Sequence, residues 1–219
     1  MAPKLNTAKF ELVGGSPSVD FVNTVVGWDG GPAREGARDY RDIPRSDKLE
    51  GYADLVAWGW HTGLLDDEEA GRLLRLAADR PREAEKVFRR ALGLRASLYR
   101  LFRSAVEGWE PEAADVETLN RELAVANKHG SLAYGRDGFG WEWDDRSGAL
   151  DSVLWQVASG AAELLASGDL SKLRQCGGAG CGWMFLDTSR NRSRQWCDMK
   201  DCGNRAKVRR FRQRQLAAR

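Results

Sequence analysis

Four cysteines near the end of the chain are the residues best suited to chemistry, and they fall into two pairs with the same spacing. Cys176 and Cys181 are separated by four residues, three of them glycine, and Cys197 and Cys202 repeat the four-residue gap. Glycine tolerates the positive φ values that let a chain turn back and aim two sulfurs at one ion. Four thiolates in a closed tetrahedral shell suit zinc. The spacing therefore predicts one structural Zn²⁺ ion with no open position for a substrate.

Two other interpretations of the cysteines are open. Four unconnected buried or reactive thiols would make no site, but two matched pairs within 27 residues argue against this. An iron–sulfur cluster uses similar ligands and would imply electron transfer, which nothing else in the sequence supports. A module of about 45 residues has too small a core to fold unaided, so metal binding would be coupled to its folding. Between the pairs, residues 183–186 and 194–196 are expected to form a hairpin.

The segment that follows Cys202 is strongly basic and is predicted to form a helix. From Lys172 to the end there are 13 basic and three acidic residues, whereas residues 1–171 contain 21 basic and 29 acidic residues. Guanidinium groups bind phosphates and can read guanine in the major groove of DNA. Double-stranded DNA is therefore the expected partner. The candidate nucleic-acid-binding residues are Arg190, Arg192, Arg194, Arg205, Lys207, Arg209, Arg210, Arg212 and Arg214.

Alternatives to DNA binding remain for this helix. It could be a solvated terminal helix, could dock on the acidic first region, or could bind RNA or another protein. Val208, Phe211 and Gln215 form a narrow stripe that would pack against the cysteine knuckle, and Asn204 and Arg205 stand where they could serve the zinc site instead of DNA. Because one finger has a small footprint, reading a specific duplex site calls for a homodimer or an accessory contact.

Residues 1–171 are predicted to form a mainly helical domain with a small β element, followed by a second unit at 172–219. Residues 132–134 and 139–143 flank a glycine-containing loop and predict a β-hairpin. Residues 27–46, rich in glycine, proline and charge, predict a mobile surface loop. Ser18 or Asp20 is the expected cap of the first helix. Helices are predicted at residues 18–26, 49–65, 67–78, 81–106, 113–126 and 150–166.

Asp20, Asn23 and Thr24 form a polar cluster beside apolar residues and are candidates for lining a pocket that binds an unknown small-molecule effector. The alternative is structural, with Asp20 capping a helix and Asn23 bridging backbone groups in the core. Neither of the two histidines, His61 and His129, belongs to a metal or nucleophile motif. We therefore assign no catalytic residue, and an enzyme with a site in the first domain is the weakest hypothesis.

The distribution of apolar residues predicts a cytoplasmic protein that does not interact with membranes. No stretch approaches the roughly 18 consecutive apolar residues of a membrane-spanning helix. The first ten residues lack the apolar segment of a secretory signal.

The chain resembles two known families in succession. Its last part resembles the CGNR zinc finger through Phe185, Leu186, Asp187, Ser189, Arg190, Asn191, Arg194 and Trp196 between the cysteine pairs, and through Cys202-Gly203-Asn204-Arg205. The run Gly14-Gly15 followed by Asp20-Phe21-Val22-Asn23-Thr24 resembles the opening of the ABATE domain. The resemblance implies a treble-clef finger with the four cysteines as ligands, behind a helical ligand-binding domain. It also implies a stress-responsive bacterial transcription regulator.

Overall fold

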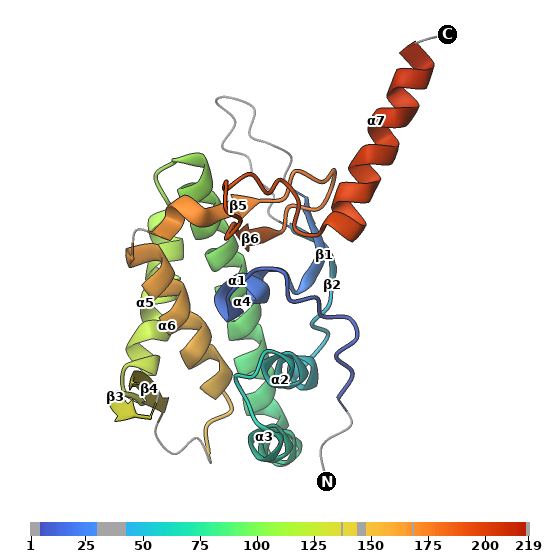
Figure 1. Cartoon of the computed structure of the whole chain (residues 1–219). Coiled ribbons are helices and arrows are strands. Elements are labelled where there is room, and N and C mark those ends of the chain that lie inside the picture. Colours follow the sequence, from blue (N-terminus) through green and yellow to red (C-terminus); the bar gives the residue numbers. More distant parts are fainter. Residues whose placement is uncertain (1–4, 30–42, 137, 144–147, 168, 218–219) are drawn as a thin grey trace.

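The computed structural model describes residues 5–29, 43–136, 138–143, 148–167 and 169–217, and it is mainly helical (Figure 1). The helices are α1 (Pro17–Val22), α2 (Tyr52–His61), α3 (Asp67–Asp79), α4 (Pro81–Glu107), α5 (Ala113–Ala126), α6 (Ser152–Ala166) and α7 (Asn204–Ala217). The strands form antiparallel pairs: β1 (Val25–Asp29) with β2 (Ile43–Asp47), β3 (Gly130–Gly135) with β4 (Gly138–Trp143), and β5 (Leu173–Gln175) with β6 (Met184–Leu186). The prediction of a mainly α fold with small β elements is confirmed.

Helix α4 is the axis of the fold. Proline is tolerated in a first helical turn because its missing N–H would have no helical partner there, and α4 begins at Pro81. The helix ends at Gly108, which adopts a φ of 76° as glycine does beyond many helices. Charged side chains lie along its whole length. Among the residues that the structure describes, none of the helices combines the length and the apolar character that crossing a bilayer requires.

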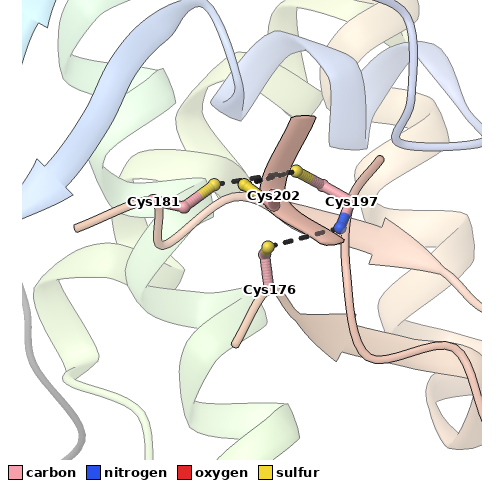
Figure 2. Close-up of side chains that lie close together, drawn as sticks. All are labelled: Cys176, Cys181, Cys197 and Cys202. Carbon is pink, nitrogen blue, oxygen red and sulfur yellow. Dashed lines mark hydrogen bonds between the residues drawn. The ribbon is translucent and has the colours of Figure 1, made fainter. Parts of the chain in front are cut away.

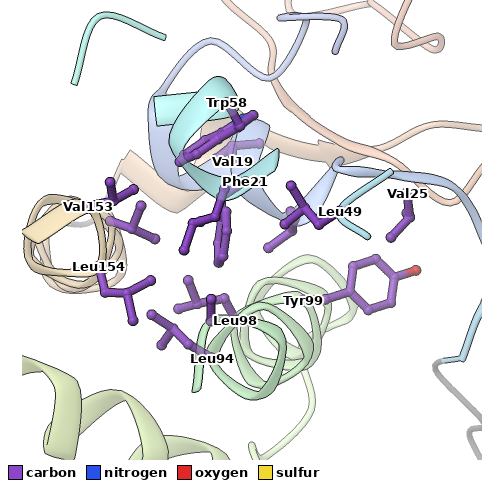
Figure 3. Packing of buried hydrophobic residues seen from close by; sticks show 14 of the residues in the cluster. Val19, Phe21, Val25, Leu49, Trp58, Leu94, Leu98, Tyr99, Val153 and Leu154 are labelled. Carbon is purple, nitrogen blue, oxygen red and sulfur yellow. The ribbon is translucent and has the colours of Figure 1, made fainter. Parts of the chain in front are cut away.

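The core lies between α4 and the helices on either side of it. Figure 3 shows Leu94 and Leu98 of α4 facing Leu154 of α6, with Phe21 of α1 and Trp58 of α2 closing the cluster. All five side chains are almost fully buried. The Trp58 ring packs on the Phe21 ring, with 5.0 Å between the ring centroids.

Local sequence signals place several helices correctly. Helix α3 begins after Asp66, whose carboxylate accepts a hydrogen bond from the Glu69 backbone N–H, while the Glu69 side chain accepts one from the Asp66 N–H. This reciprocal cap satisfies two N–H groups that have no partner inside the helix. Helix α5 spans the predicted residues, and the hairpin β3–β4 forms where it was predicted. Periodicity and capping are local properties, so the sequence alone reveals them.

The N-terminal helix is shorter than predicted and has a different cap. Ser16 caps α1, because its hydroxyl accepts a hydrogen bond from Val19 N at 3.4 Å. The assignment of the cap to Ser18 or Asp20 was therefore wrong. The helix ends at Val22, and the β-branched residues Val25 and Val26 lie in strand β1 rather than in the helix.

The prediction of a surface loop at residues 27–46 was wrong at both of its ends. Strands β1 and β2 occupy these ends and pair with each other, with Trp28 opposite Pro44. The backbone N–H of Trp28 also donates a hydrogen bond to Cys181 O at 3.1 Å. These partners are distant in sequence, which is why composition alone could not indicate the strands. The middle of the segment, residues 30–42, lies outside the described residues.

Candidate zinc centre and basic helix

The four cysteines belong to two short segments, residues 176–181 and 197–202, which bring them together in one place (Figure 2). Cys176 follows strand β5, and Cys181 lies in the turn that leads to β6. Cys197 lies in the loop after β6, and Cys202 belongs to the short helical turn η2 (Met199–Gly203) that leads into α7. All four side chains are buried, and their sulfurs lie within 4.8 Å of one another. They form a compact cluster without a disulfide.

The geometry of the cluster fits a zinc ion. In a tetrahedral site with Zn–S bonds of about 2.3 Å, neighbouring sulfurs lie about 3.8 Å apart. The Sγ atoms of Cys181 and Cys197 are 3.7 Å apart, and so are those of Cys197 and Cys202. Four buried thiols at this spacing could hold one zinc ion in a closed shell, which supports a structural role for the metal.

The pKa values of the cysteine thiols also favour a bound cation. The pKa of Cys176 is lowered to about 2, chiefly because the Cys181 thiol donates a hydrogen bond to its sulfur, followed by the thiol of Cys197. The pKa values of Cys181 and Cys197 are raised, chiefly because their protons are held by Cys176. The protein groups alone therefore favour a thiolate at Cys176 and protonated thiols at Cys181 and Cys197. A divalent cation would let all four sulfurs ionise together.

Groups around the cysteines hold the sulfurs in place. Cys176 Sγ accepts hydrogen bonds from the backbone N–H groups of Gly178 at 3.4 Å and Cys197 at 3.3 Å. Arg205 donates to Cys202 Sγ at 3.3 Å and to Asp201 Oδ2 at 2.6 Å, and the bond to Cys202 raises the arginine pKa. Such outer contacts orient metal ligands and tune the site. Arg205 thus serves the cysteine cluster, one of the two roles that the sequence left open.

The loop between the cysteine pairs is organised by Asp187 and Arg194. The buried Asp187 carboxylate accepts hydrogen bonds from the backbone N–H groups of Ser189 and Arg194, both at 2.9 Å. The bonds from Ser189 are the main reason that its pKa is lowered. The Arg194 side chain turns inward, donates to Trp196 O at 2.9 Å and to Cys197 O, and lies over the Phe185 ring. The strand at 194–196 was therefore wrongly predicted, and β6 pairs with β5 instead.

The finger and the helical region share one core. Asn23 at the end of α1 donates to Met184 O at 2.8 Å and accepts from Met184 N at 2.9 Å, so one amide engages both backbone groups of a residue in β6. The Trp183 indole donates to Val25 O at 2.9 Å. Leu186 N donates to Gly14 O at 2.8 Å. The cysteines belong to the same buried cluster as the residues of α1, α2 and α4.

All three candidate pocket residues are buried and hydrogen-bonded inside the protein. Asp20 accepts from Gly14 N at 2.7 Å, and Asn23 is occupied by Met184. Thr24 donates to Phe21 O and accepts from the guanidinium of Arg95. For Asn23 these contacts match the structural alternative, in which it bridges backbone groups in the core, whereas Asp20 binds the backbone of Gly14 and does not cap the helix.

Sequence reasoning missed the aromatic residues that seat the finger on α4. Trp28 stacks on Tyr99, with 4.0 Å between ring centroids, and the Tyr99 hydroxyl accepts a hydrogen bond from Gln175 Nε2 at 2.9 Å. Gly182 has a φ of 65°, and a Cβ atom there would lie 3.0 Å from Trp28 Cβ. A glycine directly after Cys181 was the available signal, because such a position often marks a close approach of the backbone.

Because Asp20 is buried, we expect it to make the stability of the protein depend on pH. Desolvation raises its pKa from 3.8 to about 6, against the opposing effect of the Gly14 N–H. Because the pKa of Asp20 is higher in the folded than in the unfolded state, protonation of this carboxyl stabilises the folded protein. This contribution is complete below pH 3.8 and is lost as the pH rises through 6. Lowering the pH from about 7.5 to 5 should therefore favour the wild type over Asp20→Asn by roughly 1 kcal/mol. Urea unfolding of the two proteins at both pH values tests this, since zinc-dependent effects cancel in the difference. Parallel pH profiles would contradict it.

Helix α7 projects away from the rest of the protein (Figure 1). Residues 207–216 are all exposed, and Ala206 is the buried residue near the start of the helix. The predicted docking of Val208 and Phe211 on the knuckle was wrong, because these side chains are 49% and 61% exposed. The stripe of Val208, Phe211 and Gln215 is narrow and interrupted by arginine residues. It therefore offers too little apolar surface to pack the helix against the finger. Instead, Asn204 Nδ2 donates to Lys200 O at 3.0 Å and fixes the helix start.

The structure divides the candidate nucleic-acid-binding residues into two groups. Arg194 and Arg205 bind groups of the finger itself, and Arg192 donates to Ser171 Oγ at 3.0 Å from a loop position with a φ of 48°. Arg192 and Arg205 are nevertheless exposed to solvent, as are the remaining six candidates: Arg190, Lys207, Arg209, Arg210, Arg212 and Arg214.

Comparison with protein families gives two matches in succession. Residues 15–168 match the ABATE family, which is described as "Putative stress-induced transcription regulator". Residues 172–215 match the CGNR zinc finger. The prediction of these two families in this order is confirmed, and with it the zinc-finger region behind a helical one. The description as a regulator fits a protein without enzymatic activity. The chain matches no curated protein closely enough to be counted as a relative.

Proposed function

Because the chain belongs to the ABATE family and ends in a CGNR zinc finger, we propose that it is a transcription regulator that binds double-stranded DNA through α7. The observation that carries this proposal is the exposure of a helix without acidic residues that projects from the finger. The major groove is about 12 Å wide and admits a helix of about that diameter. The basic side chains of the helix after Arg205 are Lys207, Arg209, Arg210, Arg212 and Arg214.

The zinc site supports this role by fixing the direction of α7. Cys202 lies in the turn that leads directly into the helix, and Arg205 in the first turn of α7 binds the sulfur of Cys202. A metal bound by the four cysteines would hold this turn against the core. The helix would then be presented in one orientation, which lowers the entropy lost on binding.

The loop beside the cysteine cluster offers a second contact. Asp187 fixes its backbone, and Arg190 and Arg192 lie on its exposed part. In our proposal these two side chains contact phosphates next to the groove that α7 enters. Phosphate contacts of this kind set the register and orientation of a protein on DNA.

The test compares two charge-matched variants of the zinc-loaded protein. Arg209→Ala, Arg210→Ala and Arg212→Ala remove three charges from α7, and alanine preserves the helix. Arg75→Ala, Arg82→Ala and Arg89→Ala remove three exposed charges from α3 and α4. We expect the α7 variant to bind duplex DNA at least about tenfold more weakly at low salt, and its salt slope to fall by about 3. The control should bind like the wild type.

The choice of oligonucleotides separates the competing functions. Binding of random duplex DNA that weakens with salt and depends on α7 supports the proposal. A clear preference for single strands would move the assignment to RNA, whose unpaired bases are accessible for stacking. An equal loss of DNA affinity in both triple variants would show that only the total charge matters, and not its position on α7. The absence of any binding at low salt would overturn the proposal and direct the search to a protein partner.

Sensing of a small effector by the helical region is part of the same proposal, but we assign no effector to Asp20, Asn23 or Thr24. Their polar groups already bind the protein itself. Any ligand that replaced the bonds of Asn23 would also release Met184 of the finger. Effector binding can be screened by the thermal stability of the whole protein, because a ligand that binds only the folded state raises it.

A further inference from the structure

The hairpin β3–β4 carries an uncovered apolar face that the proposed function does not use. Antiparallel pairing places Leu132 opposite Trp141 and Tyr134 opposite Phe139, so these four side chains share one side of the hairpin. We call them the aromatic face. They are 64%, 55%, 76% and 75% exposed, respectively. The other side carries small or polar residues: Ser131, Ala133, Gly140 and Glu142.

The hairpin is attached to the helical region at its base. Trp143 lies next to Trp155 of α6, with 6.2 Å between ring centroids, and Trp155 stacks on His129 at 3.9 Å. Beyond this anchor the aromatic face extends into solvent. An isolated two-stranded hairpin is only marginally stable in water, and a cover over its apolar side would stabilise it. Exposed apolar patches of this kind usually mark interaction sites.

We propose that the aromatic face is the contact surface between two copies of this chain. A two-fold dimer places the same patch on both partners, which requires a surface that does not repel itself. The four side chains of this face carry no charge, whereas residues 1–171 contain 29 acidic and 21 basic residues. The aromatic face itself therefore adds no charge repulsion between two copies.

The size of the patch is sufficient for a dimer. At the exposures observed, three aromatic side chains and one leucine offer about 500 Å² per copy. Two copies would bury about 1,000 Å², near the lower limit for a specific interface. Tyr134 and Phe139 already lie against each other at 4.9 Å between ring centroids, so little side-chain freedom remains to be lost on association.

The position of the hairpin determines what such a dimer would look like. In Figure 1 the hairpin lies at the opposite end of the protein from α7. Pairing through the aromatic faces would therefore hold the two basic helices at the two far ends of the dimer. This arrangement presents two separate positive surfaces rather than two helices side by side.

Sedimentation velocity of the zinc-loaded full chain between about 1 and 100 µM, without nucleic acid, tests the proposal. Tyr134→Lys introduces a charge on the aromatic face, and Ser131→Lys introduces the same charge on the other side of the same strand. We expect the wild type and Ser131→Lys to dimerise, and Tyr134→Lys to raise the dimer Kd by about 30-fold or more. Because DNA is absent, the result is independent of the proposed function.

A second measurement guards against a change in hairpin folding. A photoreactive benzoyl-phenylalanine in place of Phe139 should crosslink two copies, with the crosslink mapped to the partner's residues 130–143. A monomeric wild type at all concentrations would overturn the proposal and leave the face for another protein. Dimers that both lysine variants form as well as the wild type, or crosslinks that map elsewhere, would also overturn it.

Discussion

Removal of zinc will unfold the finger and lower the stability of the whole chain. The cysteines are buried in the same cluster as Phe21, Leu55 and Leu98 of the helical region, so the finger is not an independent module. Structural zinc contributes on the order of 10 kcal/mol to isolated fingers, and we expect a loss of about 5 kcal/mol or more here. Without the metal, the pKa values of Cys181 and Cys197 favour protonated thiols, which cannot replace the metal bonds.

Chelation followed by urea unfolding, with the zinc content measured in parallel, checks this prediction. Helical circular dichroism reports on the first region, and tryptophan emission includes Trp183 of the finger. Both signals should shift to lower urea, and zinc added back should restore them. Cys181→Ser should reproduce the loss without a chelator and should not be rescued by zinc. If metal-free protein unfolds at the same urea concentration as the zinc-loaded form, the structural role assigned to the metal is wrong.

Asn23→Leu should produce the second large effect, because it breaks the joint between α1 and the finger. The substitution keeps the branching and the number of side-chain heavy atoms but removes both hydrogen bonds to Met184. Met184 is fully buried as a whole residue, so its backbone N–H and C=O groups could not form hydrogen bonds with water in place of the lost ones. Buried groups without partners cost about 1–3 kcal/mol each, and we expect a total loss of about 3 kcal/mol.

The matched control for this variant is Asn120→Leu, at an exposed position on α5. A surface change of this kind should alter stability by less than about 0.5 kcal/mol. Urea unfolding compares the two variants, and limited proteolysis shows whether the finger opens before the helical region. Equal stability of both variants would mean that Asn23 does not join the two parts, and would reopen its candidacy as a ligand-binding residue.

The sequence by itself determined the features that depend on neighbours along the chain. Two equal cysteine gaps with glycine between the first pair predicted a cluster of four sulfurs, and the structure places them within 4.8 Å. Apolar residues at helical spacing predicted α4 and α5, because the positions that face the core repeat with the period of the helix. The charge of the C-terminal helix is likewise a matter of composition.

Only the tertiary structure decided the contacts between distant residues. Asn23 and Met184 are 161 positions apart, and no pattern along the chain links them. Strand β6 pairs with β5 rather than with residues 194–196, and Arg194 turns inward to the carbonyl groups of Trp196 and Cys197. Val208 and Phe211 looked able to dock, yet α7 projects into solvent. Propensity and charge act locally, whereas strand pairing and burial depend on which surfaces the whole fold brings together.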